Sequence, residues 1–309
     1  MNTPSSAVPE SFDTQRAAPA IVTVTQPLYW SLQREFWENR LIYLAPLGVA
    51  AVFLFGFMIS LFHLPGRVRS LSALTPTQQH DAIALPYDIA AGALMLTAII
   101  VAVFYSLDAL YGERRDRSVL FWKSLPVSDL TTVLAKASIP IFILPLLSFV
   151  ITIVTQIIML LMSSVVLAAS GLSPARLWSE LSFIQMSLLL LYHLVTVHAL
   201  GPAPIYAWLL LVSAWARRMP FLWAVLPPLA IVVVEKVVFN TSYLLSMLKY
   251  SASGSGLEAV TPPGSFPTHP MTHLTPGHFL GSPSLWVGLA VTAVFLAAAV
   301  RLRRNRGPI

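Results

Sequence analysis

Six apolar segments, each long enough to form a membrane-spanning helix, constrain the fold of this chain more than any other feature. A helix rises about 1.5 Å per residue, so roughly 20 apolar residues cross the hydrocarbon core of a bilayer. The predicted spans are residues 41–62, 89–110, 133–169, 183–215, 221–245 and 285–300. Composition agrees, because 56% of the residues are hydrophobic and only 10% are charged, against about 45–50% and about 25% in ordinary soluble domains. The sequence therefore predicts an all-α membrane protein with six transmembrane helices.

Two of the predicted spans are irregular. Residues 133–169 are too many for one upright crossing, so we expect their start, up to Pro140 or Pro145, to form a cytoplasmic or interfacial lead-in with a kink at proline. No turn sequence divides this segment into two spans. The fourth span is interrupted by Gly201-Pro202-Ala203-Pro204. A break of this kind is tolerated at membrane depth only where neighbouring groups or water satisfy the freed backbone.

The distribution of basic residues predicts the orientation of the chain in the membrane. An even number of spans places both termini on one side, and lysine and arginine concentrate on the cytoplasmic side of membrane proteins. The terminal side carries Arg16, Arg34, Arg40, Arg114, Arg115, Arg117, Lys123, Lys136, Arg217, Arg218, Arg301, Arg303, Arg304 and Arg306, whereas the opposite side carries Arg67, Arg69, Arg176 and Lys249. We therefore expect both termini to be cytoplasmic, in a cell membrane that we take to be the bacterial inner membrane. The net charge of +6 then reflects topology, and no nucleic-acid partner is expected.

The predicted organisation is a single transmembrane domain with short polar extensions. We expect a disordered cytoplasmic N-terminus over residues 1–26, an interfacial helix over 27–40 and a six-helix domain over 41–309. Within that domain lie a cytoplasmic loop at 112–131, an outer loop at 246–284 and a basic cytoplasmic tail at 301–309. No basic region precedes a short apolar core at the start of the chain, so we expect no cleaved signal peptide.

The segment before the first span has the pattern of an amphipathic helix. Helical periodicity places Leu28, Tyr29, Leu32 and Phe36 on one face, and Ser31, Arg34, Glu35 and Glu38 on the other. Trp30 and Trp37 suit the membrane interface. We predict an interfacial helix on the cytoplasmic leaflet of the bilayer, with Trp30, Arg34, Phe36 and Trp37 as its anchoring residues. A plain juxtamembrane anchor is the alternative.

The loop between the second and third spans is more elaborate than a connector requires. A charged turn at Glu113-Arg114-Arg115 leads into a short hydrophobic helix that ends at Pro126. Its apolar residues, Val119, Phe121 and Trp122 among them, have no lipid-embedded span to join. They must therefore dock on the membrane surface or on a partner protein. The simpler alternative is an interfacial loop that touches only lipid headgroups.

This loop resembles the one between the second and third helices in permeases of the ATP-binding-cassette type 2 exporter family. The matching residues are Glu113, Ser118-Val119-Leu120, Leu125-Pro126-Val127-Ser128 and Lys136. The resemblance implies a cytoplasmic coupling helix and a pair of permease subunits, expected here as a homodimer, bound to ATP-binding-cassette ATPase subunits. The residues that it implicates in ATPase coupling are Glu113, Arg114, Arg115, Val119, Leu120, Phe121, Trp122 and Pro126.

The same resemblance assigns ATP hydrolysis to a different chain. No Gly-x-x-x-x-Gly-Lys-Ser/Thr phosphate loop is present. We therefore expect that this subunit is not an enzyme, has no catalytic residue and holds no cofactor, and that ATP and Mg²⁺ bind to the partner ATPase.

Ionisable residues within the predicted spans are candidates for a transport pathway or gate. Glu235 and Lys236 lie inside the predicted fifth span, where a charge costs about 2.5–3.5 kcal/mol to insert. We expect them to face the bundle interior, a cavity or a dimer seam, either as pathway residues or as a polar clamp between helices. His193 and His198 lie in the fourth span. They are either proton-relay groups, of which His193 is the pathway candidate, or hydrogen-bonded packing residues.

Metal and enzyme chemistry find little support in the sequence. There is no cysteine, and the loop histidines His269, His273 and His278 have no carboxylate nearby, so a solvated loop is favoured over a zinc site. The leading hypothesis is the permease subunit of an exporter. The main alternative is a proton-coupled secondary transporter or channel without an ATPase, using Glu235, His193 and the broken fourth helix. An intramembrane enzyme would need a convergent polar constellation that these spans do not supply.

Overall fold

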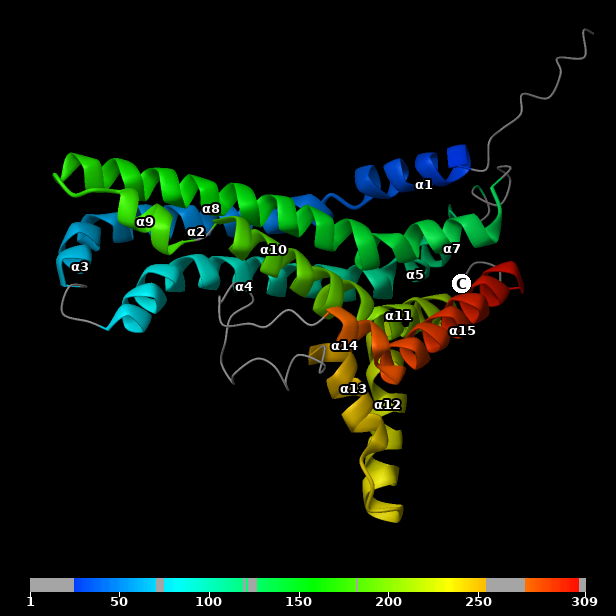
Figure 1. Ribbon diagram of the computed structural model, residues 1–309. Helices are drawn as coiled ribbons and strands as arrows, with labels where there is room; N and C mark the ends of the chain where they lie inside the picture. The colour runs from blue at the N-terminus through cyan, green and yellow to red at the C-terminus, as the bar shows by residue number, and fades with distance from the viewer. Residues whose placement is uncertain are drawn as a thin grey trace, which may run out of the picture.

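The computed structural model describes residues 25–70, 75–118, 121, 127–181, 183–253 and 276–305. Throughout these residues the regular secondary structure is helical, and none of them forms a strand (Figure 1). Six helical stretches of the described chain are long and apolar enough to cross a membrane: Leu41–Ser70, Gln78–Arg115, Asp129–Ala169, Phe183–Trp215, Pro220–Val238 and Pro283–Asn305. The prediction of an all-helical protein with six candidate spans is thus confirmed.

The first two spans form a hairpin that follows the N-terminal helix α1 (Thr25–Glu38). The first comprises α2 (Leu41–Ser60), a 3₁₀ turn η1 (Leu61–His63) and α3 (Leu64–Ser70), and the second comprises α4 (Pro76–Asp108) followed by α5 (Tyr111–Arg115). α4 begins thirteen residues before the predicted span, because a capping box between Thr75 and Gln78 starts the helix in polar sequence. Hydropathy detects only the apolar part of such a helix.

The third span is one continuous helical stretch, as predicted. It consists of α7 (Asp129–Ser138), a π-helical turn η3 (Ile139–Ile143) and α8 (Leu144–Ala169). Ser128 caps its start, since its hydroxyl accepts a hydrogen bond from the backbone N–H of Thr131 at 3.0 Å. Pro140 lies in the first half of the π turn, and Pro145 follows it in the first turn of α8. Proline has no N–H to donate to the preceding turn, and the wider π turn accommodates that loss without ending the helix.

The fourth span is interrupted where the sequence predicts. A short helix α9 (Ala175–Glu180) leads to α10 (Phe183–His193), a π-helical segment η4 (Leu194–Leu200) and α11 (Ala203–Trp215). Gly201 and Pro202 separate the π-helical segment from α11. The span is therefore a discontinuous helix.

The fifth helix ends earlier than predicted. α12 (Pro220–Val238) stops seven residues before the predicted limit, and α13 (Tyr243–Ser253) begins after a turn in which Asn240 has a φ of +50°. Glu235 and Lys236 therefore lie in the last turn of α12, not deep inside a span. α12 projects crosswise from the bundle in Figure 1. Of its most apolar stretch of 18 residues, only 6% are buried.

The chain closes with α14 (Pro276–Gly281) and α15 (Pro283–Asn305). Parts of the predicted outer loop 246–284 are thus helical, since α13 extends into it as far as Ser253 and α14 lies within it. α15 packs most extensively against α11, while α2, α4 and α8 pack against one another. A row of alanines on α4 allows this close approach of helices, and Ala90, Ala91, Ala98 and Ala102 are at most 3% exposed.

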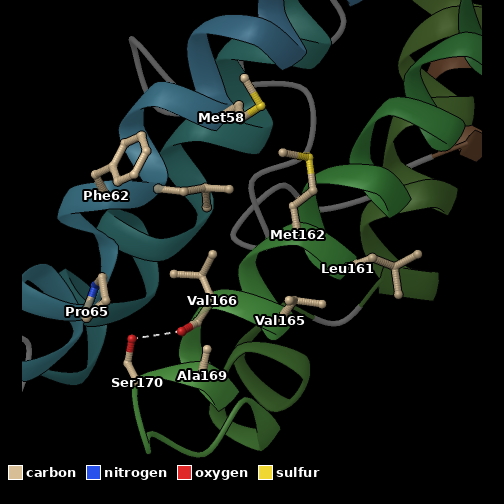
Figure 2. Close-up of a pocket in the computed structure, with 10 residues that line it drawn as sticks. Met58, Phe62, Pro65, Leu161, Met162, Val165, Val166, Ala169 and Ser170 are labelled. Carbon is tan, nitrogen blue, oxygen red and sulfur yellow. Dashed lines mark hydrogen bonds between the residues drawn. The ribbon is translucent and has the colours of Figure 1, made fainter.

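The two ends of the bundle differ in chemistry. α1 and the end of α15 lie at one end, next to α5 and the start of α7, whereas α3 and α9 lie at the other (Figure 1). At this second end an apolar groove of about 670 Å³ runs between the α2–α3 segment and α8 (Figure 2). Met58, Phe62 and Pro65 form one wall, and Leu161, Met162 and Val165 form the other.

Candidate functional site

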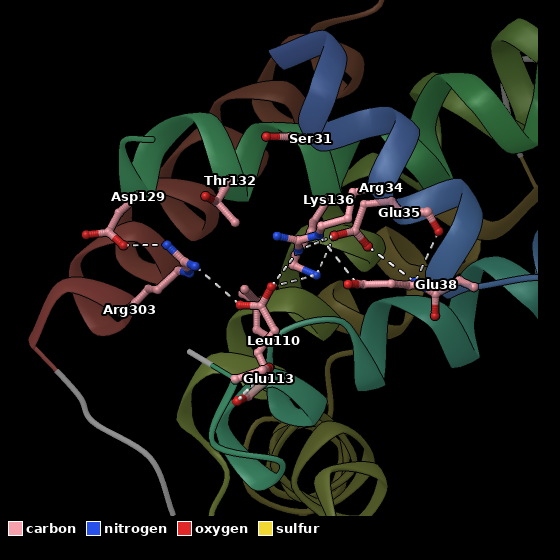
Figure 3. Close-up of polar contacts among 12 residues, drawn as sticks. Ser31, Arg34, Glu35, Glu38, Leu110, Glu113, Asp129, Thr132, Lys136 and Arg303 are labelled. Atoms are coloured by element: carbon pink, nitrogen blue, oxygen red, sulfur yellow. Dashed lines mark hydrogen bonds and ion pairs between the residues drawn. The ribbon is translucent and has the colours of Figure 1, made fainter. Parts of the chain in front are cut away.

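Buried charged side chains from four helices meet at the end of the bundle that carries α1 and α15 (Figure 3). This charged cluster consists of Arg34 and Glu35 from α1, Glu113 from α5, Asp129 and Lys136 from α7, and Arg303 from α15. Glu35 is 1% exposed, Lys136 2%, Arg303 6% and Glu113 8%. Burying a charge is costly unless it is paired. The cluster meets this condition with three cations and three anions, so its formal charge is zero.

Glu35 is the most deeply buried member of the cluster. Lys136 Nζ donates to Glu35 Oε1 at 2.8 Å, and the hydroxyl of Tyr105 donates to Glu35 Oε2 at 2.7 Å. Arg34 Nη2 also donates to Oε1, at 2.9 Å. Burial alone would raise the pKa of Glu35, but these donors outweigh it and the net pKa is lowered. Glu35 is therefore ionised at neutral pH.

Glu113 joins the predicted coupling loop to three other helices. Its Oε1 accepts from Arg34 Nη2 at 2.8 Å and lies 3.2 Å from Lys136 Nζ. Its Oε2 accepts from Arg303 Nη2 at 3.3 Å. Arg303 also donates to Asp129 through Nη1, which closes the cluster on the side of α7. One carboxylate at the start of the loop is thus bonded to α1, α7 and α15.

A second set of contacts fixes the start of the loop to α11. Arg114 is 7% exposed, and its Nη1 donates to the carbonyl oxygens of Ala214 at 2.7 Å and Ala216 at 3.1 Å. These carbonyls lie at the C-terminal end of α11, where a cation complements the unpaired oxygens and the helix dipole. The hydroxyl of Ser213 accepts from the backbone N–H groups of Leu110 at 3.0 Å and Tyr111 at 2.8 Å. The loop therefore starts from a rigid attachment.

The remaining predicted coupling residues differ in their surroundings. Arg115 is exposed and pairs with Asp116, with Nε 3.0 Å from Oδ1. Phe121 is 61% exposed. Val119, Leu120, Trp122 and Pro126 lie outside the described residues.

The predicted interfacial helix α1 turns its apolar face toward the protein, and Glu35 lies on that face. Trp30 and Trp37 are 64% and 73% exposed, whereas Phe36 packs against the core around Ile42 and Tyr105. Arg34 belongs to the charged cluster. Its neighbour Glu35, which we assigned to the polar face, lies three residues after Leu32 and points into the protein on the same side as Leu32 and Phe36. The helix contacts α7 along this inner face.

The predicted pathway residues are not brought together. The carboxylate of Glu235 accepts from the backbone N–H of Leu244 at 2.9 Å, from the N–H of Tyr243 and from the hydroxyl of Thr241 at 3.2 Å. It thereby caps α13. Glu235 is half-buried and Lys236 is exposed, so neither faces the interior of the bundle, and a position at a cavity or a dimer seam stays a prediction. His193 is buried, with Nδ1 2.9 Å from the carbonyl oxygen of Leu189.

Two buried ionisable groups inside the spans lack a complete set of partners. His198 is 6% exposed, and neither ring nitrogen has a hydrogen-bond partner among the described residues. Asp88 of α4 is 3% exposed, and within the described part of the chain its Oδ1 has no hydrogen-bond partner. Sequence reasoning placed Asp88 at a span boundary. The capping box at Thr75 would have shown that the helix starts well before it.

The described residues contain no group of three or more metal-ligating side chains. Of the loop histidines, His269 and His273 lie outside the described residues, as does the side-chain environment of His278. Comparison with protein-family models, curated proteins and solved structures finds no match to this chain.

Proposed function

We propose that this chain is the permease subunit of an ATP-driven exporter of the ATP-binding-cassette type 2 class, coupled to a separate ATPase through residues 112–131. The observation that carries the proposal is the position of Glu113. It begins the predicted coupling segment and is bonded to α1, α7 and α15 within a buried, charge-neutral cluster. A loop that only connects two helices has no need of so many fixed attachments.

Through the charged cluster, a movement of the proposed coupling segment, residues 112–131, would be transmitted to several helices at once. Separating one partner from a buried ion pair costs about 3–5 kcal/mol. A displacement at Phe121 would therefore move α1, α7 and α15 with the loop before it broke the cluster. Arg114 and Ser213 extend the same attachment to α11. Rigid-body movement of the bundle is the response expected of a coupled permease.

The proposed partners follow from the same arrangement. Phe121 and its neighbour Trp122 supply an apolar contact for the ATPase, which binds ATP and Mg²⁺ and carries out the hydrolysis. Aromatic residues commonly supply most of the binding energy at such contacts. A second copy of the chain completes the pathway, with α4 and the largely uncovered α12 facing the seam.

The test compares two exposed aromatic sites. Tagged protein is expressed with its native neighbouring genes, extracted in mild detergent and analysed for co-purifying ATPase and for ATP hydrolysis. Wild type should retain a stoichiometric ATPase, and the double variant Phe121→Ala/Trp122→Ala should lose it while still inserting in the membrane. Phe104→Ala is the control, since Phe104 is 65% exposed on α4 inside a span. Normal ATPase binding and hydrolysis in the double variant would refute the proposal.

A second candidate, a proton-coupled secondary transporter, is favoured by Asp88 and His198. Buried ionisable groups inside spans often mark ion pathways, and these two have unpartnered polar atoms. A protonophore separates the candidates when uptake of a lipophilic dye is followed in inverted membrane vesicles. ATP-dependent uptake that survives collapse of the proton gradient supports the exporter. Uptake that fails on collapse supports the secondary transporter.

A further inference from the structure

Two adjoining cavities open between the α2–α3 segment and the first turns of α4, at the end of the bundle opposite the charged cluster. Their volumes are about 450 and 390 Å³, within the usual range of ligand pockets. They share a wall made of Phe57, Ser60, Arg67, Ala82, Leu85 and Pro86. We call the two together the α2–α4 pocket.

The inner walls of this pocket are apolar and electrically neutral. Phe57, Ile83 and Leu177 are buried against the core. The deepest polar groups are the hydroxyls of Tyr87 and Ser163, which lie 3.4 Å apart and satisfy one another. Such walls suit a hydrocarbon chain and would reject a hydrated ion.

The rim of the pocket carries one charge, the guanidinium of Arg67. Within the described part of the chain no carboxylate pairs with it. The two rim hydroxyls are already committed, because Ser60 donates to the carbonyl of Phe57 at 2.8 Å and Ser70 to that of Arg67 at 2.7 Å. The five donors of the guanidinium are thus what the rim offers to a ligand, and their fork geometry matches phosphate oxygens.

From this combination we propose that the α2–α4 pocket is a binding site for one anionic phospholipid. An acyl chain fills the apolar cavities, and the phosphate headgroup pairs with Arg67. The groove of Figure 2 provides an internal contrast on the other side of α2. None of the residues that line this groove is charged, so it offers nothing to an acidic headgroup. They are Met58, Leu61, Phe62, Pro65, Leu161, Met162, Val165, Val166, Ala169 and Ser170. The lipid site is independent of the exporter hypothesis, because it lies at the other end of the bundle and is tested by binding alone.

Native mass spectrometry of the delipidated full-length protein tests the proposal. Phosphatidylglycerol and phosphatidylcholine with identical acyl chains are added separately, and bound lipid is counted. Both lipids carry a phosphate, but the choline cation of phosphatidylcholine cancels its net charge and is repelled by the guanidinium of Arg67. We therefore expect one phosphatidylglycerol to bind about tenfold more tightly than phosphatidylcholine, a difference of about 1.4 kcal/mol. Arg67→Gln should remove the preference and Arg67→Lys should retain part of it.

Arg69→Gln is the matched control, because Arg69 is two residues away and lines neither cavity. Ala82→Phe tests the cavity itself. Ala82 lines both cavities and is exposed, so a larger side chain there fills cavity space without disturbing the core. It should weaken both lipids, while Ala51→Phe on the exposed side of α2 should weaken neither.

Equal losses in Arg67→Gln and Arg69→Gln would show diffuse attraction to anionic lipid and overturn the proposal. So would unchanged binding in both Arg67→Gln and Ala82→Phe, which would show only a general lipid annulus. A thermal melt of each variant establishes that the fold is retained before binding is compared.

Discussion

Replacing Lys136 by methionine removes the cation at the centre of the charged cluster while keeping a side chain of similar length. Lys136 Nζ lies 2.8 Å from Glu35 Oε1 and 3.2 Å from Glu113 Oε1. The variant leaves three anions facing two cations in a site that is almost closed to water. We expect a loss of about 3–5 kcal/mol in the free energy of unfolding, the usual cost of stranding a buried charge.

A second substitution tests whether the loss has this cause. Glu35→Gln restores the balance of charges, and its amide oxygen can still accept the hydroxyl hydrogen of Tyr105. Lys136→Met/Glu35→Gln should therefore lose less than the sum of the two single variants, with a coupling energy between about 0.5 and 3 kcal/mol. Glu38→Gln is the control, because Glu38 is 47% exposed and its 3.4 Å contact with Arg34 is worth at most about 1 kcal/mol.

Reversible unfolding of the purified protein in mixed detergent micelles, with increasing dodecyl sulfate and helicity as the readout, gives these free energies. Losses that add to within about 0.5 kcal/mol in the double variant would refute the reasoning. So would a Lys136→Met protein as stable as wild type.

Three further predictions use the same unfolding assay. Ser213→Ala leaves the buried N–H groups of Leu110 and Tyr111 without their acceptor and should cost about 1–3 kcal/mol; a cost below about 0.5 kcal/mol would argue against this contact. Arg114→Met removes the donor to the last carbonyls of α11 and should cost about 1.5–3 kcal/mol, with faster amide exchange confined to that helix end; unchanged exchange would contradict it. The pKa of Glu35 is lower in the folded protein than in the unfolded chain, where a carboxyl has a pKa of about 4.3. The contribution of ionised Glu35 to the stability of the fold is therefore complete above that unfolded pKa, and it is lost as the pH falls through the lower pKa of the folded protein. Glu35→Gln should accordingly lose less stability than wild type on acidification, and parallel pH curves for the two proteins would be inconsistent with an ionised, bonded Glu35.

The six candidate spans and their helical character were predictable because hydropathy over about 20 residues dominates the fold of such a chain. The ends of the helices were less predictable. The polar first turns of α4 escaped the hydropathy criterion although the capping box at Thr75 identifies them. The end of α12 was missed because apolar residues continue on both sides of Asn240-Thr241-Ser242, whose composition is typical of a turn.

The charged cluster was predictable only in part. The motif resemblance singled out Glu113 and Lys136, but no local pattern relates either of them to Glu35 or Arg303. Lys136 and Glu35 are 101 positions apart, and Arg303 and Glu113 are 190 apart. We assigned Glu35 to the polar face of the N-terminal helix, although its spacing from Leu32 places it on the inward face, and its partners on other helices are evident only from the packing of α1 on α7. Long-range pairing of this kind depends on how helices assemble, which a single sequence does not specify.

Photo-crosslinking from position 121 is the most direct test of the proposed coupling to an ATPase. Benzoylphenylalanine replaces Phe121 in cells that express the native neighbouring genes, and the same residue at position 104 serves as the control within a span. The account predicts an adduct between position 121 and a nucleotide-binding protein, with no such adduct from position 104. Adducts from position 121 to lipid alone, or the same protein adduct from both positions, would contradict it.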